Sequence, residues 1–485
     1  MVSDPINIVW IKRDIRTQDH AALQAAERSG IPYRIIYLFE PSLIDHADTS
    51  ERHLQFIYHA ILDFNQRLKP YGRQIEIFHG EALAVFNHLV KIYTIKQVFS
   101  YRESGIQLTW NRDKAVSKTL HAAHVQWTEF KRDGIERGIK NRDGWDKQWY
   151  VTMSQPQIVN TYTQCTLLPL NHPFPIESKL LETISAYAST YQPAGETNAW
   201  KYLTSFAADR GKNYHRLISK PAQSRTSCGR LSPYLAWGNL SIKQAAQYIK
   251  SHHNYTSNKR AFNGILTRLK WHCHFIQKFE VECTYETQCI NQGYELLERP
   301  LNETHVEAWK VGKTGFPLVD ACMRCLIATG WINFRMRAMV VSLLCHHLDQ
   351  DWRTGVYHLA NLFLDYEPGI HYPQFQMQAG TTGVNTIGMY NPIKQSQEHD
   401  PKGEFIKKWV PELREIPEQF IHEPWKMTTM DLVFNNIIEP IDYPKPLVDL
   451  EQSGKNARTK IWGHRKHEAV KAEKKRIVKT HTRNN

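Results

Sequence analysis

Few cysteines occur in this chain, and their distribution argues against a secreted protein held together by disulfides. The 485 residues include eight cysteines, at positions 165, 228, 273, 283, 289, 322, 325 and 345, which is not the density of a disulfide scaffold. Cys322 and Cys325 form a C-x-x-C pair, but no second pair completes a zinc site, and the surrounding PLVDACMRCLIATG has the pattern of a buried helix. We therefore expect reduced thiols, no bound metal and a cytoplasmic protein.

Three further patterns are missing. The N-terminus, MVSDPINIVWIKRD, has no signal-peptide pattern, and no run of 18 apolar residues could span a membrane. No G-x-G-x-x-G follows the first strand-like run, so a dinucleotide site is not indicated there. The GKT at 312–314 lacks the first glycine of a phosphate-binding P-loop. We expect a monomer that does not associate with membranes.

The chain is basic and rich in aromatic residues. Lys and Arg number 61 against 48 Asp and Glu, which gives a net charge of +13 and an isoelectric point near 9.2. Such an excess favours a polyanionic partner, most simply nucleic acid, although part of it lies near the C-terminus. The 14 Trp and 22 Tyr suit either core packing or stacking on unpaired bases.

Strand-like and helix-like segments alternate over the first 130 residues. Short runs at 6–11, 33–39, 74–78, 97–101 and 125–130 predict strands, and amphipathic segments at 19–28, 50–69 and 82–93 predict helices. This alternation is typical of a parallel sheet. We predict an α/β domain over 1–130, Rossmann-like without its glycine motif, and an interdomain connector over 131–195.

A larger all-α domain is predicted over 196–430. Within it, the polar loop 225–232 leads into Ser232 and Pro233, the order of a helix cap and a first-turn proline. Its amides, hydroxyls and Arg230 suit a bound phosphate. The basic segment 431–485 is predicted to be a tail, in part helical, that either binds phosphates nonspecifically or is merely solvated.

The stretch from 330 to 395 is the strongest candidate for a site. Residues 331–348 predict a buried helix, and arginines near its start require anionic partners. Asp365, Glu367 and a bound phosphate are the candidates. The segment 367–383, rich in Pro, Gly, Gln and Thr, predicts a loop that lines a cofactor pocket. An ordinary surface loop is the alternative.

Several motifs resemble, in order and spacing, the flavin-binding domain of the photolyase/cryptochrome family. They are GW-x-N-F-R-x-R from Gly330, D-W-R-x-G from Asp351, D-Y-E-P from Asp365, and Y-N-P-x-x-Q from Tyr390 followed by HDPKGEFIKKWVPEL. The resemblance runs from about residue 191 to residue 425 and is looser over the N-terminal third. We identify the chain as an atypical member of this family, of prokaryotic type.

The resemblance implies FAD as cofactor and UV-damaged DNA as partner. In the family the α/β domain can carry a second, antenna chromophore, whose identity here is open, and Glu103 stands at the position at which some members hold a folate. The implied activity is light-driven repair of cyclobutane pyrimidine dimers by electron transfer from reduced flavin. A blue-light receptor of cryptochrome type and repair of (6-4) photoproducts are the alternatives.

The resemblance also assigns residues. To FAD it assigns Tyr214, Ser227, Cys228, Gly229, Arg230, Leu231, Ser232, His272, Trp331, Phe334, Arg337, Asp365, Glu367 and His371. To DNA it assigns Trp271, Arg268, Met377 and Arg335, with Trp271 and Met377 on opposite walls of the lesion site. The residues with implied catalytic roles are Trp271, His371, Arg337, Asp365 and Trp352.

Some positions depart from the family pattern. Arg268 and His272 replace residues of the usual E-L-x-W-R-E-F helix, and His371 stands where photolyases usually have Asn facing flavin N5. Because the pKa of a histidine lies near physiological pH, we expect His371 to tune the flavin, unless it bonds elsewhere in its loop. Asn333-Phe334 replaces a histidine-containing pair, which argues against (6-4) repair. Of the usual three-tryptophan chain only Trp352 remains, so flavin photoreduction must use another route.

Overall fold

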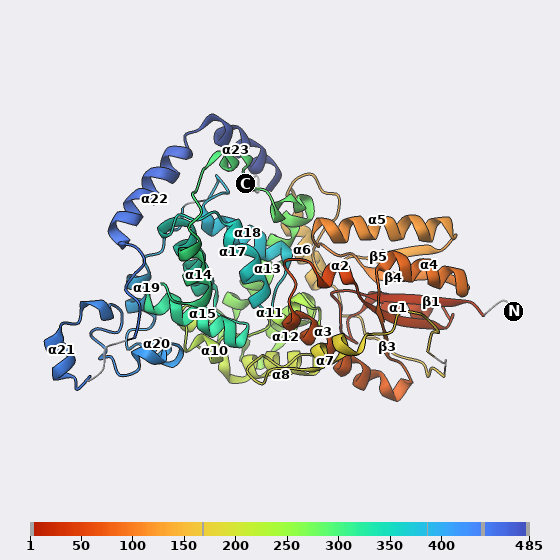
Figure 1. The fold of residues 1–485 in the computed structure, drawn as a ribbon. Coiled ribbons are helices and arrows are strands. Elements are labelled where there is room, and N and C mark those ends of the chain that lie inside the picture. Colours follow the sequence, from red (N-terminus) through yellow and green to blue (C-terminus); the bar gives the residue numbers. More distant parts are fainter. Residues whose placement is uncertain (1–3, 167–168, 386, 438–441, 482–485) are drawn as a thin grey trace.

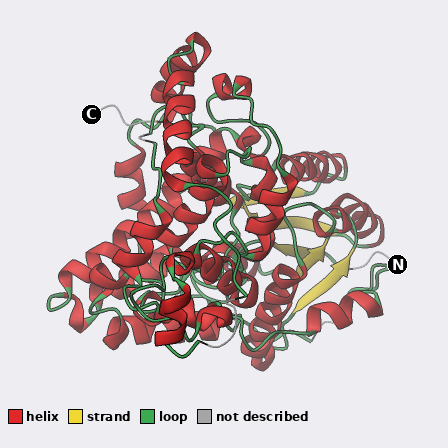
Figure 2. Cartoon of the chain, turned by 60° about the vertical axis from the view of Figure 1, so that its left-hand side comes forward, coloured by secondary structure: helices red, strands yellow, loops and turns green. Residues whose placement is uncertain are grey.

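The computed structural model describes residues 4–166, 169–385, 387–437 and 442–481. The sheet with its covering helices forms one side of the molecule, and the helical domain forms the other (Figure 1). Figure 2 shows the sheet flanked by helices and a larger part that is helical. The predicted combination of an α/β domain and an all-α domain is therefore confirmed.

The sheet has five parallel strands in the order β3-β2-β1-β4-β5. Their bounds are β1 Ile6–Ile11, β2 Tyr33–Phe39, β3 Ile75–His79, β4 Ile95–Tyr101 and β5 Gln126–Phe130. Every residue of β1 is buried, as expected for a central strand covered on both faces. All five predicted strands are present, with ends shifted by at most two residues.

Helices cover both faces of the sheet. The bounds are α1 Ala21–Arg28, α2 Pro41–Ile44, α3 Glu51–Leu68, α4 Ala82–Ile92 and α5 Gln107–Ala122. Side chains of alternate strand residues point to opposite faces. Accordingly Ile8 and Trp10 pack with α4 and α5, whereas Val9 and Ile11 pack with α1 and α3. Ser50 caps α3 through a capping box with His53, so that predicted cap is confirmed.

The segment 131–195 holds two helices, α6 Trp145–Ser154 and α7 Ser178–Ser185. Helix α6 packs against α12, and α7 packs against α3. Trp145 and Trp149 are buried among apolar side chains of both domains. The connector therefore fastens the two domains to each other.

The centre of the helical domain is formed by α18 and three helices that pack against it, α13, α16 and α17. Their bounds are α13 Lys259–Val281, α16 Phe334–Ser342, α17 Arg353–Leu362 and α18 Pro368–Ala379. The remaining helices up to residue 437 are α8 Glu196–Ser205, α9 Tyr214–Leu217, α10 Ser224–Ser227, α11 Ser232–Ala236, α12 Ile242–Ser251, α14 Glu303–Val311, α15 Pro317–Thr329, α19 Pro392–His399, α20 Glu404–Trp409 and α21 Thr429–Phe434.

The prediction of a loop over 367–383 is wrong, because α18 occupies most of it. Pro368 stands at the first helical position, where its missing N–H costs nothing. Gly380 ends the helix in the left-handed region, with φ of 82°. The proline and glycine that predicted a loop thus mark the two ends of a helix. Similarly, Leu231 rather than Ser232 occupies the cap position of α11.

The prediction of a C-terminal tail is wrong for its last described residues. Helices α22 Leu450–His464 and α23 Glu468–His481 lie at the top of the helical domain (Figure 1). Val470, Ile477 and His481 are buried, and the Tyr285 hydroxyl lies 2.5 Å from a His481 ring nitrogen. The segment therefore packs on the domain. Among the described residues, no helix combines the length and the apolar character required to cross a bilayer.

Candidate functional site

A cavity of about 290 Å³ opens between α13, α16, α18 and the loop before α11. Most of the residues that the sequence assigned to a flavin or a lesion line it. They are Tyr214, Cys228, Gly229, Arg230, Leu231, Ser232, Arg268, Trp271, His272, Trp331, Phe334, Arg337, Asp365, Glu367 and His371. Segments that are distant in sequence therefore meet in one place.

The loop 228–231 approaches α13 closely. A Cβ at Gly229 would lie 2.7 Å from Cδ1 of Ile265, so a larger residue would require the Ile265 side chain to shift. Arg230 has a positive φ of 56°, a backbone conformation that costs free energy in a residue other than glycine. Its guanidinium lies 4.1 Å from the centroid of the Trp331 ring. Burial, and then the charge of Arg225, lower the pKa of Arg230 to about 10.

The expected ion pair at the centre of the cavity is present. Arg337 Nη2 lies 2.7 Å from Asp365 Oδ2, and Arg337 Nε donates to the backbone oxygen of Ile332 at 3.0 Å. The guanidinium also stacks over Phe363, with its Cζ 3.9 Å from the ring centroid. These contacts fix the Arg337 side chain and hold a negative charge on the cavity wall.

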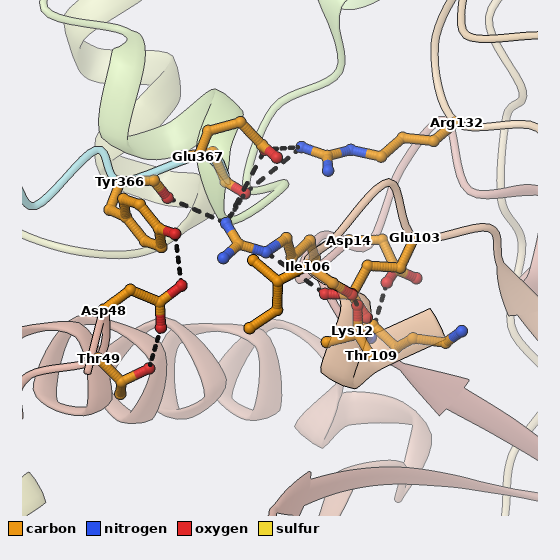
Figure 3. A network of polar contacts seen from close by, with 12 residues as sticks. Lys12, Asp14, Asp48, Thr49, Glu103, Ile106, Thr109, Arg132, Tyr366 and Glu367 are labelled. Carbon is orange, nitrogen blue, oxygen red and sulfur yellow. Dashed lines mark hydrogen bonds and ion pairs between the residues drawn. The ribbon is translucent and has the colours of Figure 1, made fainter. Parts of the chain in front are cut away.

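Glu367 is held by cations from outside the helical domain. Its carboxylate accepts a hydrogen bond from Arg132 at 2.9 Å and lies 3.8 Å from Arg13 (Figure 3). Arg13 follows β1, and Arg132 belongs to the connector. Sequence reasoning missed both arginines, because a separation of 235 residues between Arg132 and Glu367 leaves no local pattern.

Several buried polar atoms in the cavity have no hydrogen-bond partner among the described residues. They are Arg230 Nε, Arg268 Nη1, Asp365 Oδ1, Glu367 Oε1, and both ring nitrogens of His272. A buried polar group without a partner costs free energy, so such groups are rare in folded proteins. A cluster of donors and acceptors around one cavity fits a large polar ligand such as FAD.

His371 lies at the inner end of the cavity. Nε2 of His371 lies 2.9 Å from the backbone oxygen of Val356. Burial lowers the pKa of His371 to about 4, so the ring is neutral near pH 7. Since a carbonyl oxygen only accepts, Nε2 carries the proton and Nδ1 is the acceptor.

Two exposed aromatic side chains flank the mouth of the cavity. Trp271 on α13 is 41% exposed and Phe334 on α16 is 38% exposed. Arg268 lies between them, with its Cζ 4.4 Å from the Trp271 ring centroid and 5.1 Å from that of Phe334. Exposed aromatic rings at a cavity mouth offer flat surfaces for stacking.

Four assigned residues do not line the cavity. Ser227 ends α10, and Arg335 donates to the Ser219 hydroxyl at 3.0 Å. Met377 also lies outside the lining, because Gln374, Phe375 and Gln378 form the cavity face of α18. Trp352 is buried behind Phe375, with 6.5 Å between the ring centroids. The expectation that Met377 forms the wall opposite Trp271 is therefore wrong.

A second cavity lies where β1, β2 and β4 end, beside the helical domain. It has a volume of about 100 Å³ and is lined by charged side chains that pair with one another. Arg112 contacts Glu40 at 2.8 Å and Glu103 at 2.6 Å. Glu103, which the sequence indicated for an antenna pigment, is therefore engaged with arginine.

Family comparisons cover most of the chain. Residues 7–135 match the family model described as DNA photolyase, and residues 265–463 match that of the FAD binding domain of DNA photolyase. A deoxyribodipyrimidine photo-lyase of Alkalihalophilus pseudofirmus is 27% identical, covering 94% of this chain and 97% of that protein. A cryptochrome DASH of Synechocystis is 26% identical, covering 94% and 98%.

Comparison with solved structures leads to the same family. A crystal structure of a Synechocystis cryptochrome superposes with a TM-score of 0.82 at 22% sequence identity. The superposition covers 95% of this chain and 99% of that one. Both domains and their relative placement are therefore shared with that structure.

Proposed function

Because this chain belongs to the photolyase/cryptochrome family, we propose that it repairs cyclobutane pyrimidine dimers in DNA with light and reduced FAD. The relatives at 26–27% identity include both photo-lyases and cryptochromes DASH. The choice between repair and light sensing therefore depends on the residues around the cavity.

The pair of exposed rings at the cavity mouth is the observation that carries the proposal. A lesion must leave the duplex to reach a cofactor inside a protein, and unstacked bases are commonly held against aromatic side chains. Trp271 and Phe334 stand at the entrance with large exposed surfaces, although aromatic side chains are usually buried. A dimer stacked between them would lie directly over the cavity.

The chain's own residues bind and orient the reactants. FAD, when bound and reduced, supplies the light-excited electron that opens the cyclobutane ring and receives it back. Arg230 and the loop 228–231 suit the phosphates of FAD. Arg337 and Asp365, fixed by their ion pair, would provide charged groups on the cavity wall for its ring system. The net charge of +13 draws in the DNA backbone.

A repair assay tests the proposal. Purified, reduced protein is mixed with UV-irradiated oligothymidine, and the absorbance lost on dimer formation is followed under blue light and in the dark. We expect recovery in the light only. No recovery with FAD bound and reduced would refute dimer repair, and the same assay with a (6-4) photoproduct would follow.

One observation favours a light receptor without repair activity. The guanidinium of Arg268 occupies the space between Trp271 and Phe334, where a base would stack. If Arg268 remains there, the entrance is closed to a lesion. Arg268→Ala separates the two functions. Under the repair proposal it alters affinity for dimer-containing DNA, whereas under the receptor alternative neither wild type nor variant distinguishes damaged from intact DNA.

A further inference from the structure

The remaining member of the usual tryptophan chain is separated from the cavity. Trp352 does not line it, and Phe375 stands between them at 6.5 Å from the Trp352 ring centroid. A phenylalanine ring is far harder to oxidise than tryptophan or tyrosine. The family resemblance places Arg299 at the third position of the chain, and an arginine side chain cannot serve as an electron carrier. An electron that leaves Trp352 therefore meets no intermediate carrier on its way to the cavity.

Three tyrosines lead from the cavity toward the surface instead. Tyr366 lines the cavity, Tyr372 is fully buried, and Tyr357 is half-buried. The ring centroids of Tyr366 and Tyr372 are 6.4 Å apart, as are those of Tyr372 and Tyr357. The hydroxyl of Tyr366 also lies 3.3 Å from that of Tyr372. The rings therefore form a continuous series of short steps.

Oxidation of a tyrosine requires a proton acceptor, and the α/β domain provides one. The Tyr366 hydroxyl donates to Asp48 Oδ2 at 2.5 Å (Figure 3). The Tyr372 hydroxyl lies 3.5 Å from the same atom. Asp48 lies between α2 and α3 and is buried. An oxidised phenol is a strong acid, so a carboxylate at hydrogen-bond distance receives its proton readily.

The acceptor is kept in its charged form. Burial raises the pKa of Asp48, but the hydrogen bond and charge of His46 outweigh it and leave that pKa below its ordinary value. His46 Nδ1 lies 2.7 Å from Asp48, and its Nε2 lies 3.3 Å from Glu286. Hydrogen bonds to these two carboxylates raise the pKa of His46 to about 10. Asp48 is therefore a carboxylate at neutral pH.

We propose that Tyr366, Tyr372 and Tyr357 form the electron route by which the flavin is photoreduced, with Asp48 as the proton acceptor. Tyr366 gives one electron to the photoexcited, oxidised flavin. Its O–H bond breaks, the proton passes to Asp48, and a neutral tyrosyl radical remains. The proposal depends on FAD binding in the cavity and is independent of which lesion, if any, is repaired.

The radical then moves outward. Tyr372 gives one electron and one proton to the Tyr366 radical, and Tyr357 does the same for Tyr372. A thiol in solution finally supplies one electron and one proton to Tyr357 and is itself oxidised to a thiyl radical. All three tyrosines are restored. The flavin has gained one electron, and Asp48 holds one proton that it releases to solvent.

The experiment uses the full chain loaded with oxidised FAD, under blue light with dithiothreitol. The rate of bleaching of the oxidised flavin is measured, and radicals are trapped by freezing for electron paramagnetic resonance. We expect a tyrosyl signal in wild type and a bleaching rate at least about tenfold lower in Tyr372→Phe. FAD content is measured in every variant.

Two control variants make the result decisive. Tyr294→Phe removes a buried hydroxyl that has no hydrogen-bond partner among the described residues, and Trp352→Phe removes the remaining member of the tryptophan chain. Both should bleach at the wild-type rate. Loss of bleaching in Trp352→Phe with an unchanged rate in Tyr372→Phe would overturn the proposal, as would the lack of a tyrosyl signal in wild type.

Asp48→Asn tests the proton acceptor. In D₂O, wild-type bleaching should slow, because a proton moves with the first electron. The variant should bleach more slowly in H₂O and lose this isotope effect, whereas an unchanged isotope effect would exclude Asp48. Chemically reduced Tyr372→Phe should repair as well as reduced wild type. If wild type repairs nothing and the tyrosyl signal remains, only the repair function fails.

Discussion

The two cavities of this protein differ in whether their buried charged side chains have partners for all their polar atoms. At the end of the sheet, Arg112 is satisfied by Glu40, Glu103 and Asp113 at 2.6–2.8 Å. None of the described residues that line this cavity has a buried side-chain polar atom without a partner. In the helical domain, Arg230, Asp365 and Glu367 each retain such an atom. The first arrangement stabilises the fold, and the second is prepared for a ligand.

The largest expected effect is a loss of stability from a substitution in the cavity at the end of the sheet. Arg112→Ala should lower the free energy of unfolding by about 3–5 kcal/mol, because it leaves buried carboxylates without their cation. Urea denaturation at neutral pH measures the change. Lys212→Ala, which removes an exposed pair with Asp209, is the control and should cost less than about 1 kcal/mol. Equal effects of the two substitutions would remove the distinction between the cavities.

Arg230→Ala should act on the ligand and leave the fold intact. Loss of a charged hydrogen-bond donor should weaken FAD binding by about 2 kcal/mol, which is roughly thirtyfold in Kd. The apoprotein should lose little stability, because Arg230 makes only a long hydrogen bond from Nη1 to the Arg225 oxygen at 3.4 Å and a ring contact with Trp331, and its Nε has no partner among the described residues. Quenching of FAD fluorescence gives the Kd, and the exposed Arg216→Ala is the matched control. A destabilised apoprotein with normal FAD affinity would contradict this.

Trp271→Ala examines the mouth of the open cavity. Its ring is exposed and contacts Arg268, so FAD should remain bound while affinity for dimer-containing DNA falls by about 1.5 kcal/mol, the range for stacking of one base. Electrophoretic mobility shifts with damaged and intact duplexes measure it. Unchanged affinity for the lesion would exclude a stacking role.

The smallest effect concerns His371 and pH. The unfolded histidine titrates near its ordinary pKa, whereas burial lowers the folded value to about 4. The unfolded chain therefore takes up a proton first, and stability that is complete above about pH 6.5 is lost as the pH falls toward 4. His371→Gln should reduce that loss by about 1 kcal/mol near pH 6. Urea denaturation of wild type and His371→Gln is compared at pH 7 and pH 6. Equal losses of stability in the two proteins would show that His371 does not contribute to the pH dependence.

The sheet could be predicted from the sequence because its information is local. Short, mostly buried runs bounded by polar turns identify β1 to β4, and β1 and β2 begin and end where they were expected. Helix α18 could not be recognised in the same way. Pro368 and Gly380 are compatible with a loop or with the two ends of a helix, and packing against α13 and α16 decides between them.

The cavity was predictable only as far as the family motifs extend. Arg337 and Asp365 are part of those motifs, and they pair as expected. Asp48 and Arg132 belong to none of these motifs. Their partners Tyr366 and Glu367 lie 318 and 235 residues away in the sequence. Contacts of this kind depend on how two domains are docked, and no local pattern records them.

The cations around Glu367 determine how this protein can be divided. A fragment that begins at residue 196 would contain most residues of the cavity wall, but it would lack both Arg13 and Arg132. Glu367 would then lack both cations, and Tyr366 would lose Asp48, the acceptor of its hydrogen bond. The helical half is therefore not a transferable module, and fusions or chimaeras should exchange both halves together.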